Sequence, residues 1–196
     1  MRLHRFAVLT AAVTYVLLIA GGLVHATGSS LACPDWPLCH GTLMPAMVDG
    51  VEYEHSHRLI AGLVATLTVV MGGWIFAARR RDLYALGVAA PLMVLAQAVL
   101  GGLTVIFKLP KWITLSHLTL SMCFFSVLLI IAVRTRPLEL AGAPAAPRAA
   151  TRQLLAVTGA LVLLQMTLGG LVRHSMAGLA CITFPLCFGS AWPADS

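Results

Sequence analysis

Residues 21–41 read "GGLVHATGSSLACPDWPLCHG", and residues 169–189 read "GGLVRHSMAGLACITFPLCFG". The two stretches align without a gap at an offset of 148 positions. Eleven of their 21 positions are identical, including both cysteines and the Pro-Leu-Cys near the end of each copy. Each stretch closes an apolar run and then becomes more polar. A repeat of this kind predicts a duplicated architecture built from two similar halves.

The apolar runs around these stretches indicate a membrane protein. Hydrophobic residues make up 59% of the 196-residue chain, charged residues only 10%, and the mean hydropathy is +0.91. Five runs reach the roughly 18 residues that a bilayer crossing needs, at 6–24, 59–78, 83–107, 113–133 and 153–172. We therefore predict an all-α integral membrane protein, with a four-helix transmembrane bundle and a fifth transmembrane helix that begins a truncated second repeat. An even number of spans separates the copies, so their pseudo-symmetry axis is expected along the membrane normal.

Basic residues predict the orientation. Nine of the thirteen lysines and arginines lie in "MRLHR", in "ARRRD" and in the segment 134–152. The positive-inside bias places these parts in the cytoplasm, and the loops at 25–56, 108–112 and 173–196 outside. The first run follows basic residues as a signal peptide does, but its outer end recurs before an internal helix, which favours a permanent span. We expect a multi-pass protein of a bacterial-type inner (plasma) membrane.

The segment between the fourth and fifth runs divides the chain. It reads "RTRPLELAGAPAAPRAATR", is rich in Pro, Ala and Arg, and has no apolar period. These features are typical of a connector. We predict a four-helix half at 1–136, a cytoplasmic linker at 137–152, and the first helix and Cys loop of an incomplete second half at 153–196.

Paired glycines recur toward the outer ends of the outward-going runs. "QAVLGGL" (97–103) and "QMTLGGL" (165–171) share Gln followed by Leu-Gly-Gly-Leu, and "GGL" also occurs at 21–23. Small residues of this kind allow helix backbones to approach closely. The other interpretation is a flat surface that accommodates a planar ligand.

Four cysteines form two Cys-x5-Cys pairs in predicted outer loops, Cys33 with Cys39 and Cys181 with Cys187. Structural disulfides are the first interpretation, because disulfides persist outside the cytoplasm. A redox-active pair is the second. A zinc site of Cys33, Cys39 and His40 is the third, but the second copy has Phe188 where His40 stands. Cys123 lies within an apolar run and is expected to pack as a small apolar residue.

The stretch "EYEHSHR" (52–58) concentrates ionisable residues just before the second run. In helical geometry Glu54 and His57, three positions apart, share one face, and His55 points elsewhere. Ionisable groups near membrane depth are costly and mark functional sites. A solvent-facing interfacial cluster is the alternative for both histidines.

His117 lies inside the fourth run, about five residues beyond Trp112, or on the order of 8 Å into the span. His57 is expected at a comparable depth on another helix. Two neutral imidazoles on facing helices of a bundle are a common way to hold haem iron. The pattern therefore predicts a haem site with His57 and His117 as iron ligands and Glu54 beside it.

These motifs together resemble the first half of a haem A synthase. The resemblance rests on "TGSSLACPDWPLC", on the Glu-x-x-His-Arg of Glu54 to Arg58, on "LGGLTV" before the short "KLPKW" loop, and on the helix that carries His117. It extends through the fifth run and its Cys-x5-Cys loop. The combination is specific, although each motif alone is not.

The resemblance implies an eight-helix membrane oxidoreductase made of two four-helix halves, each able to hold a porphyrin. It would oxidise the C8 methyl of haem O to the formyl of haem A for cytochrome oxidase. Carried onto matching positions, Glu54 is the essential carboxylate, His57 and His117 are the axial pair, and Cys33 with Cys39 forms the loop disulfide. Haem O and haem A are then substrate and product, haem B is a further candidate, and iron is the metal.

Positions equivalent to Glu54, His57 and His117 would fall at 202, 205 and 265, beyond Ser196. We therefore expect no second haem site within this sequence, and a homo-oligomer is one way for the half to work. Other expected partners are membrane lipid, a haem O-producing farnesyltransferase as substrate donor, and an electron donor of unknown identity. No stripe of basic and aromatic residues suggests nucleic acid.

Two other functions stay open at this point. A non-catalytic haem-binding or oxidase-assembly protein would use the same histidines without producing haem A. A quinone-linked thiol oxidoreductase would use Cys33 and Cys39, but its usual motif is a tighter Cys-x-x-Cys, which this chain lacks.

Overall fold

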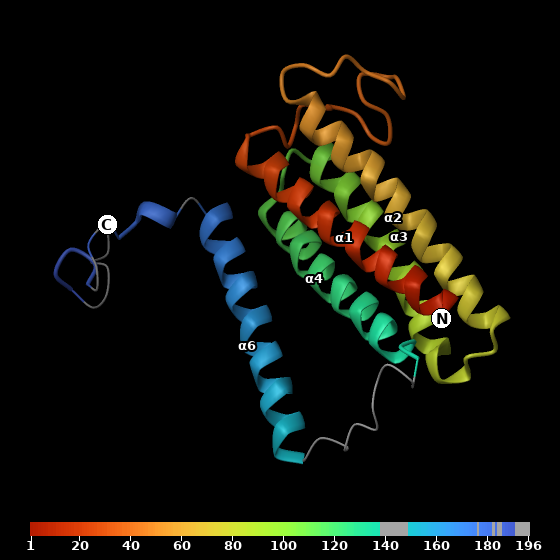
Figure 1. Cartoon of the computed structure of the whole chain (residues 1–196). Helices are drawn as coiled ribbons and strands as arrows, with labels where there is room; N and C mark the ends of the chain where they lie inside the picture. Colours follow the sequence, from red (N-terminus) through yellow and green to blue (C-terminus); the bar gives the residue numbers. More distant parts are fainter. Residues whose placement is uncertain (138–148, 176, 182, 184–185, 191–196) are drawn as a thin grey trace.

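The computed structural model describes residues 1–137, 149–175, 177–181, 183 and 186–190 (Figure 1). Within these residues the secondary structure is helical, apart from two isolated β-bridges. The elements in chain order are α1 (Arg2–Ala26), α2 (Val51–Ala77), η1 (Arg81–Leu83), α3 (Tyr84–Ile106), α4 (Lys111–Arg134), α6 (Ala149–His174) and η2 (Ala177–Leu179). The predicted all-α class is confirmed.

All five predicted spans are present as helices long and apolar enough to cross a bilayer. The second starts earlier than the apolar run, because α2 begins at Val51 and takes the whole of "EYEHSHR" into its first turns. The fifth also starts earlier, at Ala149. Most of the predicted linker at 137–152 lies outside the described residues, so the domain boundaries stay a prediction.

The first four helices close into a bundle. Each helix packs against two neighbours, in the order α1, α2, α3, α4 and back to α1, as Figure 1 shows. Apolar side chains from all four helices meet in one core, and the largest fully buried ones include Met71, Ile75, Leu128, Ile131 and Val64. Buried threonine hydroxyls in this core donate to carbonyls one turn earlier, as Thr68 does to Val64 at 2.7 Å, so no polar cost accompanies their burial.

Hydrogen bonds tie the arginine-rich end of the bundle together. The ring Nδ1 of His4 lies 2.9 Å from the carbonyl oxygen of Ala132. The turn after α2 joins the same end, because Arg80 donates to the carbonyl of Arg134 at 3.1 Å and pairs with Asp82. The start of α1, the turn around Arg80 and the end of α4 therefore form one face. The opposite end carries the loop 27–50, which we call the Cys loop.

The repeat seen in the sequence is also a repeat in structure. Cys33–Cys39 and Cys181–Cys187 are both disulfides. A β-bridge follows each, Cys39 to Thr42 and Cys187 to Ser190. Each member of the second set lies 148 positions after its counterpart, so the disulfide and the β-bridge correspond in the described parts of the two copies.

Side-chain oxygens close the two loops in the same place. Asp35 accepts from the backbone N–H of His40 at 2.6 Å, and the hydroxyl of Thr183 accepts from the N–H of Phe188 at 2.7 Å. His40 and Phe188 share a left-handed backbone with φ of 52°. Thr183 therefore takes the acceptor role of Asp35 at the equivalent position of the second copy.

Helix α6 lies outside the bundle and packs against α4 (Figure 1). The hydroxyls of Thr119 and Thr167 are 3.3 Å apart. A Cβ added at Gly170 would lie 2.8 Å from Leu118, so this glycine allows the close helix contact that paired glycines predict. None of the described α6 residues is buried.

Candidate functional site

The Cys loop is held on the bundle by an ion pair in the first turns of α2. Glu54 is only 4% exposed. One carboxylate oxygen accepts from Arg58 at 2.6 Å, and the other accepts from the backbone N–H of Cys33 at 2.8 Å. Both oxygens are therefore engaged, and the charge of the buried carboxylate is compensated by a neighbouring guanidinium.

Arg58 makes further hydrogen bonds to the Cys loop. Its guanidinium donates to the backbone carbonyls of Asp35 at 2.7 Å, Leu38 at 2.5 Å and Cys33 at 3.1 Å. A planar guanidinium can bind several acceptors at once because its five N–H groups point in fixed directions. Glu54 and Arg58 thus fix the position of the disulfide-bonded turn relative to α2.

His57 packs against the wall of α1. A Cβ added at Gly21 would lie 3.0 Å from Cε1 of the ring, 3.5 Å from Nδ1 and 3.8 Å from Nε2. The Leu17 carbonyl, one turn before Gly21, lies beside the same ring. Nδ1 is buried and makes no hydrogen bond. The glycine leaves room for the imidazole where a side chain would fill it.

His117 occupies the matching position between α3 and α4. A Cβ at Gly101 would lie 3.4 Å from Cε1 of the ring and 3.9 Å from Nδ1. The backbone of Gln97, one turn before Gly101, lies beside the ring, and the Gln97 side chain donates to the carbonyl of His117 at 3.0 Å. Nδ1 of His117 is also buried without a partner.

The two imidazoles are therefore held alike by separate helices. His57 is on α2 and His117 on α4, and each ring lies beside a backbone carbonyl and a glycine one turn apart on the preceding helix, α1 or α3. The two rings lie close enough to interact electrostatically. In both rings Nδ1 is nearer the glycine than Nε2 is. Nε2 is then the nitrogen further from the helix wall and the candidate ligand atom.

The glycine pairs do more than bring helices together. Gly21 and Gly101 face imidazoles, and a Cβ on Gly102 would lie 2.8 Å from the indole of Trp36 in the Cys loop. The paired glycines were expected to serve either helix packing or a planar ligand. Three of them lie against flat side-chain rings of the protein itself.

His55 points away from His57, as the helical spacing predicts, and it is buried, not solvent-facing. Its exposed fraction is 5%, and neither ring nitrogen has a hydrogen-bond partner. One ring nitrogen lies within 4.8 Å of the sulfurs of Cys33 and Cys39. The sequence reasoning missed this neighbour, because only the fold of the Cys loop brings the disulfide over His55.

The zinc set of Cys33, Cys39 and His40 is not assembled. The two sulfurs are bonded to each other, and the ring of His40 turns back so that Nε2 lies 3.0 Å from the carbonyl of Ala32. Both sulfur-bearing residues are fully buried, which favours a structural disulfide over a freely exchanging one. Cys123 is the one free cysteine in the described part of the chain, and it is half-buried in α4.

A second histidine cluster joins α1 to α6 at the Cys-loop end. The rings of His25 and His174 are 5.0 Å apart between centroids, and Arg173 approaches the carbonyl of His25 at 3.4 Å. His25 and Arg173 occupy equivalent positions in the two copies of the repeat. Equivalent positions of two copies contact each other when they lie close to a symmetry axis, so this contact fits a pseudo-symmetry axis between α1 and α6.

Asp35 in the Cys loop is an acid whose pKa is clearly shifted. Hydrogen bonds from the backbone N–H of Gly41, at 2.7 Å, and of His40 hold the pKa of Asp35 below its ordinary value. Those bonds favour the charged carboxylate because the N–H groups donate to it. Asp35 is thus a turn-closing residue at the surface of the Cys loop.

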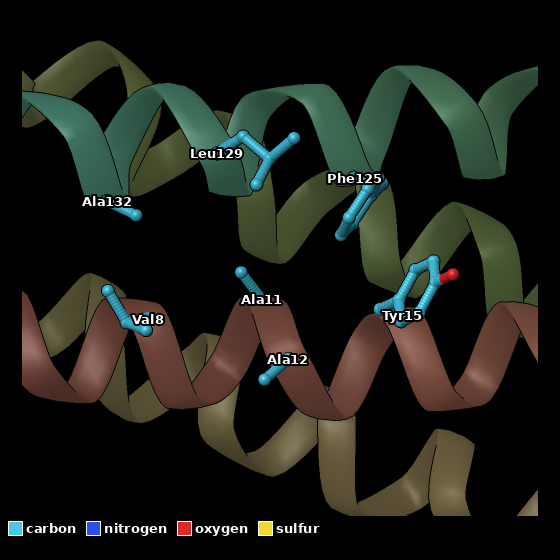
Figure 2. A pocket seen from close by; sticks show the side chains of 7 residues that line it. All are labelled: Val8, Ala11, Ala12, Tyr15, Phe125, Leu129 and Ala132. Carbon is cyan, nitrogen blue, oxygen red and sulfur yellow. The ribbon is translucent and has the colours of Figure 1, made fainter.

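An apolar groove runs between α1 and α4 on the outer surface of the bundle. Figure 2 shows side chains of the two helices facing each other across it, namely Val8, Ala11, Ala12, Tyr15, Phe125, Leu129 and Ala132. The rings of Tyr15 and Phe125 stack with centroids 6.2 Å apart. Its lining contains no imidazole or carboxylate, so the groove offers contact for hydrocarbon and takes no part in the histidine site.

Comparison with known proteins agrees with this geometry. The chain matches the COX15-CtaA family, described as cytochrome oxidase assembly protein, over residues 4–55 and 51–196. It is 32% identical over 199 residues to a protein of Alkalihalophilus pseudofirmus named "Heme A synthase", covering 98% of this chain and 66% of that protein. A protein of the same name from Exiguobacterium sp. is 31% identical, covering 92% and 61%.

The chain thus spans less than two thirds of the length of these relatives. The match nevertheless includes every element that carries the two imidazoles, the ion pair and both Cys loops. On these grounds the chain belongs to the COX15-CtaA family, the family of the haem A synthases.

Proposed function

We propose that the α1–α4 bundle binds haem O, with His57 and His117 as the iron ligands, and oxidises its C8 methyl group to the formyl group of haem A. The observation that carries this proposal is the matched pair of imidazoles, each seated against a glycine of the preceding helix. The relatives named "Heme A synthase" support the same activity.

The residues present fit a haem iron. Neutral imidazoles on separate helices of a bundle are suitable axial ligands. Both rings have a buried Nδ1 without a hydrogen bond, and a backbone carbonyl lies beside each ring. A small rotation of each ring would let this carbonyl accept from Nδ1–H, which fixes the tautomer and leaves Nε2 free to bind metal.

The protein contributes position and charge to this reaction. Haem, when bound, supplies the redox chemistry. Glu54 already accepts two hydrogen bonds, so we propose that it acts through its negative charge and by holding the Cys loop over the bundle. An anion in a site of low dielectric favours positive charge that develops nearby. A water that reaches Glu54 could also pass it a proton after Arg58 moves away.

We propose that the Arg80 end of the bundle faces the cytoplasm and the Cys loop faces outward. The arginines of residues 79–81, together with Arg2, Arg5 and Arg134, support this orientation. A farnesyltransferase that makes haem O is the proposed substrate donor. A second copy of the chain is the proposed neighbour of α6, whose apolar side chains are exposed in the described residues.

The test is to express the chain in cells that make haem O but lack their own haem A synthase. The purified protein should carry haem with a bis-histidine spectrum, and extracted pigment should contain haem A. His57→Ala and His117→Ala should each lose the bis-histidine spectrum. His40→Ala, a control in the exposed part of the Cys loop, should retain it.

Two results would contradict the proposal. If wild-type protein purified from haem-sufficient cells were colourless, the bundle would not bind haem. Bound haem without any haem A would leave the second candidate, a non-catalytic haem-binding assembly protein, which the family description favours.

A further inference from the structure

A cluster of three metal-binding residues lies beneath the Cys loop, on a different face of α2 from His57. Cys33, Cys39 and His55 each offer one donor atom, and these atoms lie within 4.8 Å of one another. All three residues are buried. In the described part of the chain this is the one group of three or more such donors.

His55 is the anomaly in this cluster. The residue is only 5% exposed, yet both ring nitrogens are buried without a hydrogen-bond partner. Buried polar atoms are nearly always satisfied, and each exception needs an explanation. The adjacent carboxylate of Glu54 does not supply one, because its hydrogen bonds are made with Arg58 and with the Cys33 N–H.

We propose that Cys33, Cys39 and His55 bind one thiophilic divalent cation, of the class of Zn²⁺, when the disulfide is opened. An external dithiol breaks the Sγ–Sγ bond and gives two electrons to the two sulfurs, and the dithiol is oxidised to its own disulfide. Each cysteine thiol then releases its proton as it binds the cation. The cation itself is not reduced or oxidised.

The donor set suits such an ion. Two thiolates and one imidazole are ligands that zinc takes in proteins, and three protein ligands leave a fourth position for a non-protein ligand. Because the sulfurs must separate from bonding distance, the turn must open slightly. Arg58 still holds the carbonyls on both sides of this turn, so the turn stays near α2.

Charge balance favours a divalent over a monovalent ion. Two thiolates beside the Glu54–Arg58 pair would leave two uncompensated negative charges in a buried site. Buried charges are costly unless they are paired. A divalent cation cancels both charges, whereas a monovalent ion such as Cu⁺ leaves one.

The second Cys loop provides a matched comparison within the chain. Cys181 and Cys187 have the same spacing and the same disulfide. Among the described residues, however, no histidine or carboxylate joins them in a three-donor group. The proposal therefore predicts binding at the first pair and not at the second.

The experiment compares oxidised and dithiol-reduced haem-loaded protein, purified with a tag that contains no histidine and kept free of oxygen. After removal of the dithiol, Co²⁺ is added as a spectroscopic probe and Zn²⁺ as its competitor. Reduced wild-type protein should bind one equivalent with sulfur-to-metal absorption, which Zn²⁺ removes. Oxidised protein should show no such absorption.

Variants identify the ligands. His55→Asn should weaken Co²⁺ binding by at least about tenfold, and the double change Cys33→Ser with Cys39→Ser should abolish it. The double change Cys181→Ser with Cys187→Ser, and separately His40→Ala, should leave binding unchanged. Equal binding by His55→Asn and wild type, or by oxidised and reduced protein, overturns the proposal.

Discussion

Gly21 of α1 lies against the imidazole of His57 on α2, so closely that a Cβ there would be 3.0 Å from Cε1 of the ring. The next residue, Gly22, has nothing within 4 Å of the corresponding position. Two adjacent glycines on one helix therefore differ in what they accommodate. One is part of the histidine site, and the other faces open space.

This contrast makes Gly21→Ala a test of the site. The added methyl group must displace the His57 ring by a few tenths of an ångström, and overpacking of this kind costs about 1–3 kcal/mol. We expect haem binding to weaken by about 5- to 150-fold, with an altered ligand spectrum. Gly22→Ala is the matched control and should bind as wild type does. Equal spectra for the two variants would mean that His57 does not ligate from this position.

The ion pair between Glu54 and Arg58 gives a second prediction. Glu54→Gln removes the charge that compensates Arg58, whose side chain is only 14% exposed. Breaking a buried pair costs about 3–5 kcal/mol, and we expect the lower end because Arg58 keeps three carbonyl acceptors. Thermal unfolding in detergent should show the loss. Asp82→Asn breaks the exposed pair with Arg80 and should change the unfolding temperature little.

If Glu54→Gln left the unfolding temperature unchanged but stopped haem A formation, Glu54 would serve the reaction alone. If the unfolding temperature and haem A formation both fell, the Glu54 carboxylate would serve both the reaction and the attachment of the Cys loop. The two readouts therefore separate the catalytic and structural contributions of one residue.

The turn of the Cys loop gives a prediction about pH. The pKa of Asp35 lies below its ordinary value of 3.8, first because of the N–H of Gly41. A carboxyl group whose pKa is lower in the folded state contributes stability above the unfolded value, and this contribution is lost as the pH falls through the folded value. Wild-type protein should therefore lose stability below about pH 3.8.

Asp35→Thr is the informative variant, because the second copy uses Thr183 for the same bond. A neutral hydroxyl keeps the acceptor but does not titrate. The difference in unfolding temperature between wild type and Asp35→Thr should shrink as the pH falls below 3.8. If the difference in unfolding temperature stayed constant down to pH 2, the charge of Asp35 would not contribute to the stability of the loop.

The spans and the repeat could be predicted from sequence because both depend on local patterns. Apolar length predicts a crossing helix, and the 148-residue offset predicts the second Cys turn, even where Thr183 replaces Asp35. The comparable depth of His57 and His117 could be predicted, but their positions against Gly21 and Gly101 could not, because the glycine pairs indicated only helix packing or a planar ligand.

The neighbours of the Cys loop could not be predicted in this way. Helical spacing places Glu54 on the same face as His57, but the loop decides that both carboxylate oxygens are taken by Cys33 and Arg58. It also decides that His55, and not the adjacent His40, lies beside the sulfurs. These contacts join residues about 20 positions apart through an irregular loop, for which no periodic pattern exists.

Gly101 and Gly102 allow the histidine site and the Cys loop to be perturbed separately. A Cβ on Gly102 would lie 2.8 Å from the indole of Trp36, whereas one on Gly101 would lie 3.4 Å from His117. Gly102→Ala should therefore displace Trp36 and loosen the loop, at a cost of about 1–3 kcal/mol. In the wild-type protein both cysteines are fully buried. A looser loop should expose the disulfide, so an external dithiol should reduce Cys33–Cys39 faster in the Gly102→Ala variant. Gly101→Ala should instead change the haem spectrum and leave the reduction rate near that of wild type. If Gly102→Ala altered the spectrum and not the reduction rate, Trp36 would not hold the loop over α3.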